Sequence, residues 1–355
     1  MSDRSLASLG SLGSLGALAI VVALGSLAFV SVADQAWAGG AESQKTAATK
    51  AWTPPLAPDG QPDLQGVWHS NSATPLERPK ALEGRQFLTD GEVADLRKQA
   101  DRLFRDGSGN SDFAGGDNFF LAAFANLELY KNPNSTSSSV EMDDREFDNR
   151  TSLIVDPPDG KIPALTPEAQ QKRAAAQEAG RRPPAGPEDF NNALRCITFG
   201  VPRLGGNFGV GIYGYYQIVQ TRGYVVLITE AIHAARIIPL DGRPHLPQSI
   251  RQWHGDSRGR WEGKTLVVDT TNFSPKSNFM GSAESLHVVE RLTRVAPDMI
   301  NYEITINDPA TWTKPWSAVI RLRQTPDKIY EFACHEGNYD VMRGMLVGAR
   351  AEGGR

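Results

Sequence analysis

The feature that most constrains the fold is a run of short strand-like segments between about Tyr213 and Phe332. Apolar and polar residues alternate along them, as from Ile300 to Asn307, and turns rich in Gly, Pro and Asp separate them. No helical crossover lies between the segments, so we expect antiparallel pairing. We predict a mainly β fold, an antiparallel meander or lipocalin-like barrel of roughly eight strands, the last at residues 328–337. An open sheet packed by N-terminal helices is the alternative.

Residues 62–212 are expected to supply one strand and a helical decoration before the β domain of residues 213–355, which ends in a helix. Gly66 and Trp68 resemble the opening Gly-x-Trp of lipocalin-type barrels, in which the Trp closes one end. An ordinary core Trp is the alternative. Thr89 and Glu92 have capping-box spacing, and Thr166 precedes a proline, so each threonine is predicted to start a helix.

The first 38 residues have the pattern of a signal peptide. Arg4 precedes an apolar stretch around residues 15–32, and the small-x-small sequence Ala36-Trp37-Ala38 is typical of a cleavage site. A membrane anchor is the alternative. Residues 39–61 are rich in Ala, Thr and Pro and are interpreted as a linker. We therefore expect a periplasmic or secreted protein with no stable membrane insertion after cleavage near Ala38.

The composition gives few pointers to chemistry. The chain has 355 residues and a formal net charge of −4, without a dense Lys/Arg stripe, so no nucleic-acid partner is expected. The sequence has no nucleophile elbow, Walker loop or H-E-x-x-H motif, and residues 205–211 are interpreted as a glycine-rich turn. The six histidines lack zinc-site spacing. We predict no metal and no cofactor, and the oligomeric state stays open.

The only two cysteines, Cys196 and Cys334, are expected to form a disulfide in an oxidising compartment. Such a bond would tie the segment before the β-rich region to its far end. The loop-entropy model assigns it roughly 4–5 kcal/mol of stabilisation. Two free buried thiols are the alternative.

The connection from Ile238 to Gly263 carries an unusual density of Arg, His and Trp. Arginine suits carboxylate or phosphate groups, and tryptophan suits a sugar face or an apolar ring. We predict that this connection borders a cavity at a barrel mouth and that it contributes the ligand-binding residues His245, Arg251, Trp253 and Arg258. A loop in which these side chains only pin the backbone is the alternative.

The strand pair before this connection holds further candidates. If the alternation continues without a bulge, Val226, Ile228, Glu230 and Arg236 share one face, where Glu230 and Arg236 need each other or a ligand. His233, near Glu230 and Asp241, could act as a general base. A structural ion pair and a structural histidine are the alternatives.

The C-terminal stretch "YEFACHEGNY" places His335, Glu336 and Tyr339 directly after Cys334. A corner made rigid by the disulfide is a suitable place for acid/base chemistry. A helix cap with buried polar contacts is the alternative. We therefore select His233, His335, Glu336 and Asp241 as catalytic candidates, with Glu230, Arg236 and Tyr339 added to the ligand-binding set.

Several motifs resemble a family of exported bacterial proteins, most of them described as hypothetical. They are "PDLQGVW", "IVDPPDGKIPALTPEAQ", "IPLDGRPHLPQSIRQWHGDSRGRWEGKTLVVDTTNF", "DPATWTKPW" and "YEFACHEGNY". The resemblance covers nearly all of the chain after the signal peptide, implies export and one shared architecture, and assigns no activity. Our first functional hypothesis is a small-molecule enzyme, a lyase, isomerase or hydrolase using general acid/base chemistry without a nucleotide cofactor. The second is a lipocalin-like periplasmic carrier of an apolar or glycosidic ligand, and a structural envelope protein is the third.

Overall fold

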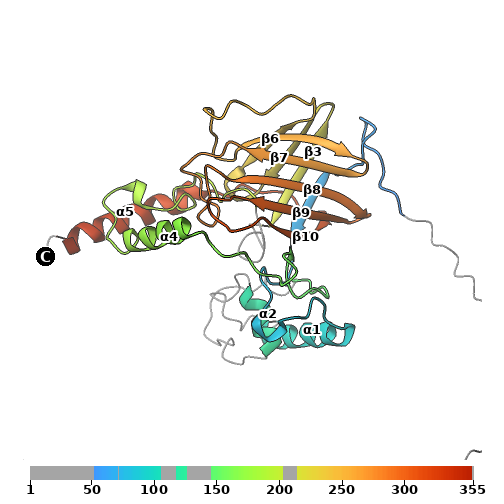
Figure 1. Ribbon diagram of the computed structural model, residues 1–355, viewed down its shortest axis with the longest axis horizontal. Helices are drawn as coiled ribbons and strands as arrows, with labels where there is room; N and C mark the ends of the chain where they lie inside the picture. Colours follow the sequence, from blue (N-terminus) through green and yellow to red (C-terminus); the bar gives the residue numbers. More distant parts are fainter. Residues whose placement is uncertain (1–51, 71, 105–116, 126–144, 203–213, 354–355) are drawn as a thin grey trace, which may run out of the picture. The chain divides into compact units, whose positions relative to one another are not determined.

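Ten strands form one antiparallel sheet in the order β5-β4-β3-β1-β10-β9-β8-β7-β6, with β2 paired to β10 (Figure 1). The computed structural model describes residues 52–70, 72–104, 117–125, 145–202 and 214–353, all within the compact unit Ala51–Arg355. The predicted signal peptide and the turn at residues 205–211 lie outside these residues. The strands are β1 (Gly66–Ser70), β2 (Ile154–Asp156), β3 (Tyr215–Thr221), β4 (Tyr224–Thr229), β5 (Ala235–Pro239), β6 (Asp256–Glu262), β7 (Thr265–Thr271), β8 (His287–Ala296), β9 (Met299–Asn307) and β10 (Trp316–Thr325).

The sheet curves into a nearly closed barrel, as the alternating pattern predicts. The two end strands, β5 and β6, meet at a seam that no backbone pairing among the described residues bridges. Gly259 of β6 allows this approach. A Cβ there would lie 2.5 Å from Leu240 Cδ2 and 2.8 Å from Ile238 Cγ2. The seam is therefore closed by side-chain packing at this point rather than by a hydrogen-bond ladder.

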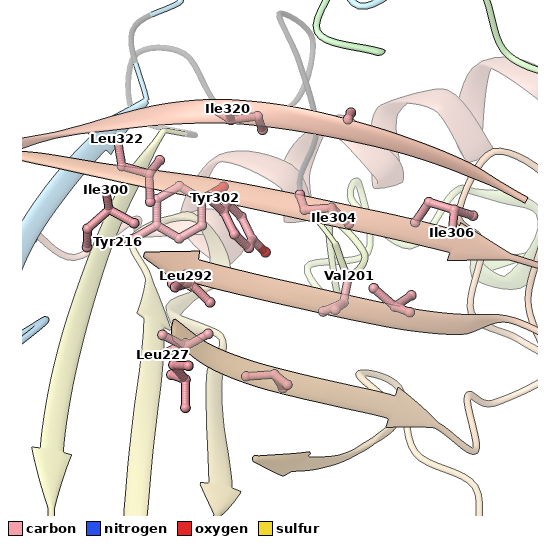
Figure 2. Close-up of a cluster of buried hydrophobic side chains, with 14 of the residues drawn as sticks. Val201, Tyr216, Leu227, Leu292, Ile300, Tyr302, Ile304, Ile306, Ile320 and Leu322 are labelled. Carbon is pink, nitrogen blue, oxygen red and sulfur yellow. The ribbon is translucent and has the colours of Figure 1, made fainter. Parts of the chain in front are cut away.

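The barrel interior is filled by the inward-facing residues of each strand. Leu227, Leu292, Ile300 and Tyr302 all belong to this core, which Figure 2 shows between the strands. Trp68 of β1 belongs to the same core, where it is fully buried and donates its indole N–H to Leu64 O at 2.8 Å. The Arg294 guanidinium lies 5.3 Å from the centroid of the Trp68 ring.

Within the described ranges the helices are α1 (Asp90–Phe104), α2 (Asp117–Ala125), α4 (Pro167–Ala179) and α5 (Cys334–Gly353), with short 3-10 turns at Lys80–Leu82, Pro187–Asp189 and Ala231–His233. The predicted capping box is present, because Thr89 N donates to Glu92 Oε2 at 2.8 Å and Glu92 N donates to Thr89 Oγ1 at 3.2 Å. Thr166 caps α4 through Ala169 N at 3.1 Å. Both helix starts are therefore confirmed.

Two local predictions are wrong. Residues 328–333 form no strand, and the segment predicted as the last strand instead leads into α5, which begins at Cys334. The β4–β5 connection contains a 3-10 turn in which Ile232 (φ 60°) and His233 (φ 50°) adopt positive φ. This turn shifts the alternation, so that Arg236 pairs with the inward-facing Leu227 instead of sharing a face with Val226 and Ile228.

The predicted disulfide is confirmed. Cys196 and Cys334 are bonded, with their Cα atoms 5.9 Å apart and 138 residues of sequence separation. The bond fixes the first residue of α5 to the segment that precedes β3. The Asn338 amide of α5 donates to both sulfur atoms, at 3.4 Å to Cys196 Sγ and 3.3 Å to Cys334 Sγ.

Candidate functional site

A cavity of 570 Å³ lies along the seam between β5 and β6. We call it the seam cavity. The Ile238–Gly263 connection supplies most of its wall, so that connection borders a cavity as predicted, and the cavity lies along the seam, whereas a barrel mouth was predicted. The lining residues are Ile197, Ala235, Arg236, Ile237, Arg251, Gln252, Trp253, His254, Gly255, Asp256 and Ser257.

Arg236 reaches the seam cavity from an inward-facing position on β5 and pairs with Glu290 of β8. Its Nη1 lies 2.6 Å from Glu290 Oε2 and its Nη2 lies 2.8 Å from Glu290 Oε1. Glu290 occupies the inward position between Val288 and Leu292 and is fully buried. The Glu230–Arg236 ion pair considered from the sequence is therefore not formed, and the partner of Arg236 is Glu290.

The surroundings determine the protonation of Arg236 and Tyr302. Burial disfavours the charged form of Arg236, but the charge and hydrogen bonds of Glu290 outweigh burial and raise the Arg236 pKa. Tyr302 donates its hydroxyl to Glu290 Oε1, and burial, followed by the charge of Glu290, holds the Tyr302 pKa well above its usual value. Tyr216 packs edge-on against Tyr302, with ring centroids 6.3 Å apart (Figure 2). The site thus holds one cation, one carboxylate and one phenol that stays protonated.

His254 is the second polar group of the cavity wall. Its Nε2 lies 2.8 Å from Thr198 Oγ1, and the same oxygen accepts a hydrogen bond from Gly200 N at 2.8 Å. Burial, with the positive charge of Arg236 as a further cause, lowers the His254 pKa to about 4. The imidazole is therefore neutral near pH 7.

Asp256 connects the cavity wall to a hydrogen-bonded chain on the outer face of the barrel. Its Oδ2 lies 3.0 Å from His245 Nδ1, and His245 Nε2 lies 2.9 Å from Asp269 Oδ1. The other Asp269 oxygen lies 3.0 Å from His287 Nε2. This hydrogen bond lowers the Asp269 pKa and raises the His287 pKa.

Arg258 completes the support of this chain. Its Nη1 lies 2.6 Å from Asp256 Oδ1, and its Nε donates to Pro244 O at 3.0 Å. His245 and Arg258, both predicted to bind ligand, are thus brought together on Asp256. Their hydrogen bonds hold the connection against the outer face of β6 and β7, and neither residue is among those that line the cavity.

The other candidates of the connection have different partners. Arg251 and Trp253 line the seam cavity, and Arg251 pairs with Glu284 at 3.1 Å. Asp241 is exposed and bonded to Arg243. The structure therefore places Asp241 in a surface ion pair rather than in the cavity.

The remaining candidates lie near the disulfide corner. Glu230 Oε2 accepts from Tyr330 N at 3.1 Å, and His233 Nε2 accepts from Phe332 N at 3.0 Å. These two bonds fix the segment that leads into Cys334. His335, Glu336 and Tyr339 instead border a separate hollow of 330 Å³ beside Cys196. The catalytic candidates are thus distributed over three places.

The sequence analysis did not select Glu290, Tyr302, His254 or Thr198. A signal for Glu290 existed, because it interrupts the apolar face formed by Val288 and Leu292. Within the described residues, no group of three or more His, Cys, Asp or Glu side chains is arranged to hold a metal ion. None of the helices in these ranges has the length and apolar character required to cross a membrane. No family model, curated protein or solved structure matches the chain.

Proposed function

We propose that the protein is an exported barrel protein that binds a small organic molecule in the seam cavity. The observation that carries the proposal is a cavity of 570 Å³ with Arg236 and a neutral His254 in its wall. This volume falls within the range of about 300–1,000 Å³ that is usual for small-molecule sites. Apolar side chains, including Ile197, Ile237 and Trp253, offer contact area for the body of the ligand.

The charges of the site favour an uncharged ligand with a carbonyl or hydroxyl oxygen. Arg236 is neutralised by Glu290, and Arg251 is paired with Glu284. Asp256 is paired with Arg258. An anion entering the cavity would therefore meet little net positive charge. The bonds to Glu290 engage two of the five N–H donors of Arg236, so further donors can serve a neutral acceptor.

The pKa of His254 favours a role in ligand binding over a role as a general base. A general base works best when its pKa lies near the working pH. A pKa of about 4 leaves His254 neutral but weakly basic near neutrality. It can orient a polar group of the ligand by hydrogen bonding, while proton uptake would be costly.

The direct test is a thermal-shift and calorimetric screen with matched ligands, for example the ketone benzylacetone and the carboxylate hydrocinnamate. We expect ketones to bind more tightly than their matched carboxylates. Ile237→Asp, at a cavity-lining residue that is 66% exposed, should weaken ketone binding about tenfold or more. Ile250→Asp is the matched control, because Ile250 is 47% exposed and is not among the lining residues. Equal weakening by the two variants would contradict the proposal.

A second candidate function is an acid/base enzyme, a lyase, isomerase or hydrolase. The observation in its favour is that Asp256 lines the cavity and lies 3.0 Å from His245 Nδ1. A carboxylate with an imidazole partner is a common proton-transfer pair. Product analysis by mass spectrometry of any ligand that binds separates the two functions. An enzyme should convert the ligand and lose turnover in Asp256→Asn, whereas a carrier returns it unchanged.

A further inference from the structure

A further hollow, of 760 Å³, lies between one face of α4 and the connection from β7 to β8. We call it the α4 groove. Its α4 wall is formed by residues three, four or seven positions apart, which share one face of a helix. The lining residues are Leu165, Ala169, Lys172, Arg173, Ala176, Gln177, Pro275, Lys276, Ser277, Asn278, Met280, Gly281, Ala283 and Thr311.

The position of α4 is set by its N-terminal end. Thr166 N donates to Thr311 O at 3.0 Å, and Thr166 Oγ1 donates to Ala310 O at 2.8 Å. The opposite wall is held by Asn192 Nδ2, which donates to Lys276 O at 2.9 Å. No residue of α4 is buried, so this helix face does not pack into the core. The hollow therefore lies between two anchored walls.

The groove carries positive charge without a matching carboxylate. Lys172, Arg173 and Lys276 line it and are exposed, and none of its lining residues is acidic. Within the described part of the chain, none of these three side chains has an ion pair. The charged groups of the seam cavity are paired instead, so the two hollows differ in net charge.

The buried hydroxyl groups on the floor of the groove are already hydrogen-bonded within the protein. Ser277, Ala283 and Thr311 are buried there. Ser277 Oγ donates to Trp253 O at 2.9 Å, and Thr311 Oγ1 donates to Asp308 Oδ2 at 2.7 Å, so both hydroxyl protons are already used. Ala169, Ala176 and Met280 add small or apolar surface to the walls. An apolar chain can lie there without leaving a hydrogen-bonding group unsatisfied.

We propose that the α4 groove binds an amphipathic organic carboxylate, with its head group between Lys172, Arg173 and Lys276 and its alkyl chain along the alanines and Met280. Charge complementarity selects the carboxylate, and the apolar walls select the chain. The α4 groove shares no lining residue with the seam cavity. The groove is proposed to bind an anion, whereas the seam cavity is proposed to bind an uncharged molecule. The two proposals can therefore fail independently.

The test is isothermal titration of the full chain with octanoate, with octanol as the uncharged match and inorganic phosphate as an anion without a chain. We expect octanoate to bind about tenfold more tightly than octanol, since two or three exposed ion pairs together contribute on the order of 1.4 kcal/mol. We also expect it to bind about tenfold more tightly than phosphate, which lacks the alkyl chain that the apolar walls would contact. Absent octanoate binding, or equal affinity for octanol or phosphate, would overturn the proposal.

Variants locate the site. Lys172→Glu/Arg173→Glu should weaken octanoate binding about tenfold or more. Lys161→Glu/Lys264→Glu makes the same change in net charge at exposed lysines outside the groove and should leave the affinity within about twofold. Ile237→Asp, in the seam cavity, should also leave octanoate binding unchanged. If the control pair weakens octanoate as strongly as the groove pair, the effect is one of overall charge and the proposal is wrong.

Discussion

Two inward-facing arginines of the same barrel, Arg236 of β5 and Arg294 of β8, are used in different ways. Arg236 forms a bidentate ion pair with the fully buried Glu290 and borders the seam cavity. Arg294 donates to Asp63 O at 2.8 Å and to Pro297 O, and its guanidinium lies over the Trp68 ring. One arginine therefore faces a carboxylate and a cavity, and the other faces backbone carbonyls and an aromatic ring.

The partners of a buried arginine decide whether it only stabilises the core or can also bind a ligand. Backbone carbonyls near Arg294 gain hydrogen-bond partners, and the Trp68 ring supplies a cation–π contact, so that guanidinium holds the core around Trp68 together. Arg236 holds a second buried charge in place and keeps further N–H donors at a cavity wall. The barrel thus separates the core around Trp68 from a region suited to binding.

The largest expected effect comes from removing the carboxylate of the Arg236 pair. Glu290→Gln leaves the Arg236 charge buried without a counter-charge, so we expect a loss of about 3–5 kcal/mol in the free energy of unfolding. Chemical denaturation measures it. Glu303→Gln, on the outward face of the adjacent β9, is the matched control and should change stability by less than about 0.5 kcal/mol.

A second variant shows whether this loss is electrostatic. In Arg236→Met/Glu290→Gln no charge remains, and the amide oxygen can still accept from Tyr302. We expect stability to return toward that of the parent protein, while binding of benzylacetone is lost. If the double variant is no more stable than Glu290→Gln, packing rather than charge decides stability here, and the contrast with Arg294 disappears.

The next effect, of about 3 kcal/mol, is a pH dependence of stability that arises from His254, which lies with Arg236 in the wall of the seam cavity. The folded-state pKa of His254 is about 4, below the ordinary value of 6.5 that we expect in the unfolded chain. The unfolded chain therefore takes up a proton first as the pH falls. This stability is present above pH 6.5 and is lost as the pH falls from 6.5 to about 4.

Denaturation at pH 7 and pH 4.5 in the parent protein and in His254→Gln measures this term. The variant should show a smaller loss on acidification, whereas His335→Gln, at an exposed position of α5, should behave like the parent. His287 has a raised pKa, so its contribution is present below pH 6.5 and is lost as the pH rises through the folded-state pKa. It therefore does not account for a loss on the acid side. Identical acid sensitivity of His254→Gln and the parent would count against the burial of His254 beside Arg236.

The sequence was sufficient for the parts of the molecule that local patterns determine. Strand alternation and turn residues predicted the antiparallel barrel, and the capping residues Thr89 and Thr166 predicted two helix starts. The disulfide followed from the presence of only two cysteines in a sequence predicted to be exported. Each of these inferences depends on residues that are close in sequence or on a partner choice that has only one solution.

The sequence did not allow us to predict which side chains on distant strands pair with each other. Arg236 and Glu290 are 54 residues apart, and the three connections from β5 to β8 separate them, so many carboxylates were possible partners. The 3-10 turn at Ile232 and His233 also reversed the predicted face of Arg236, because one irregular turn changes the parity of a strand. The last predicted strand failed because "YEFAC" is apolar enough for a strand, whereas the disulfide and the bonds to Glu230 and His233 hold it as an irregular segment that leads into α5.

The smallest expected effect concerns Arg294 and its contacts around Trp68. Arg294→Met keeps an apolar side chain against Trp68 but removes the donors to Asp63 O and Pro297 O, so we expect a loss of about 2 kcal/mol in the free energy of unfolding. Arg291→Met is the matched control on the outward face of β8, where the arginine pairs with Glu262 near solvent, and should cost less than about 1 kcal/mol. Affinity for benzylacetone should be unchanged in Arg294→Met, because this arginine is not among the residues that line the seam cavity. If Arg294→Met weakened that binding as much as Arg236→Met/Glu290→Gln, the surroundings of the two arginines would act as one site, and the core around Trp68 and the seam cavity would not be separate regions of this barrel.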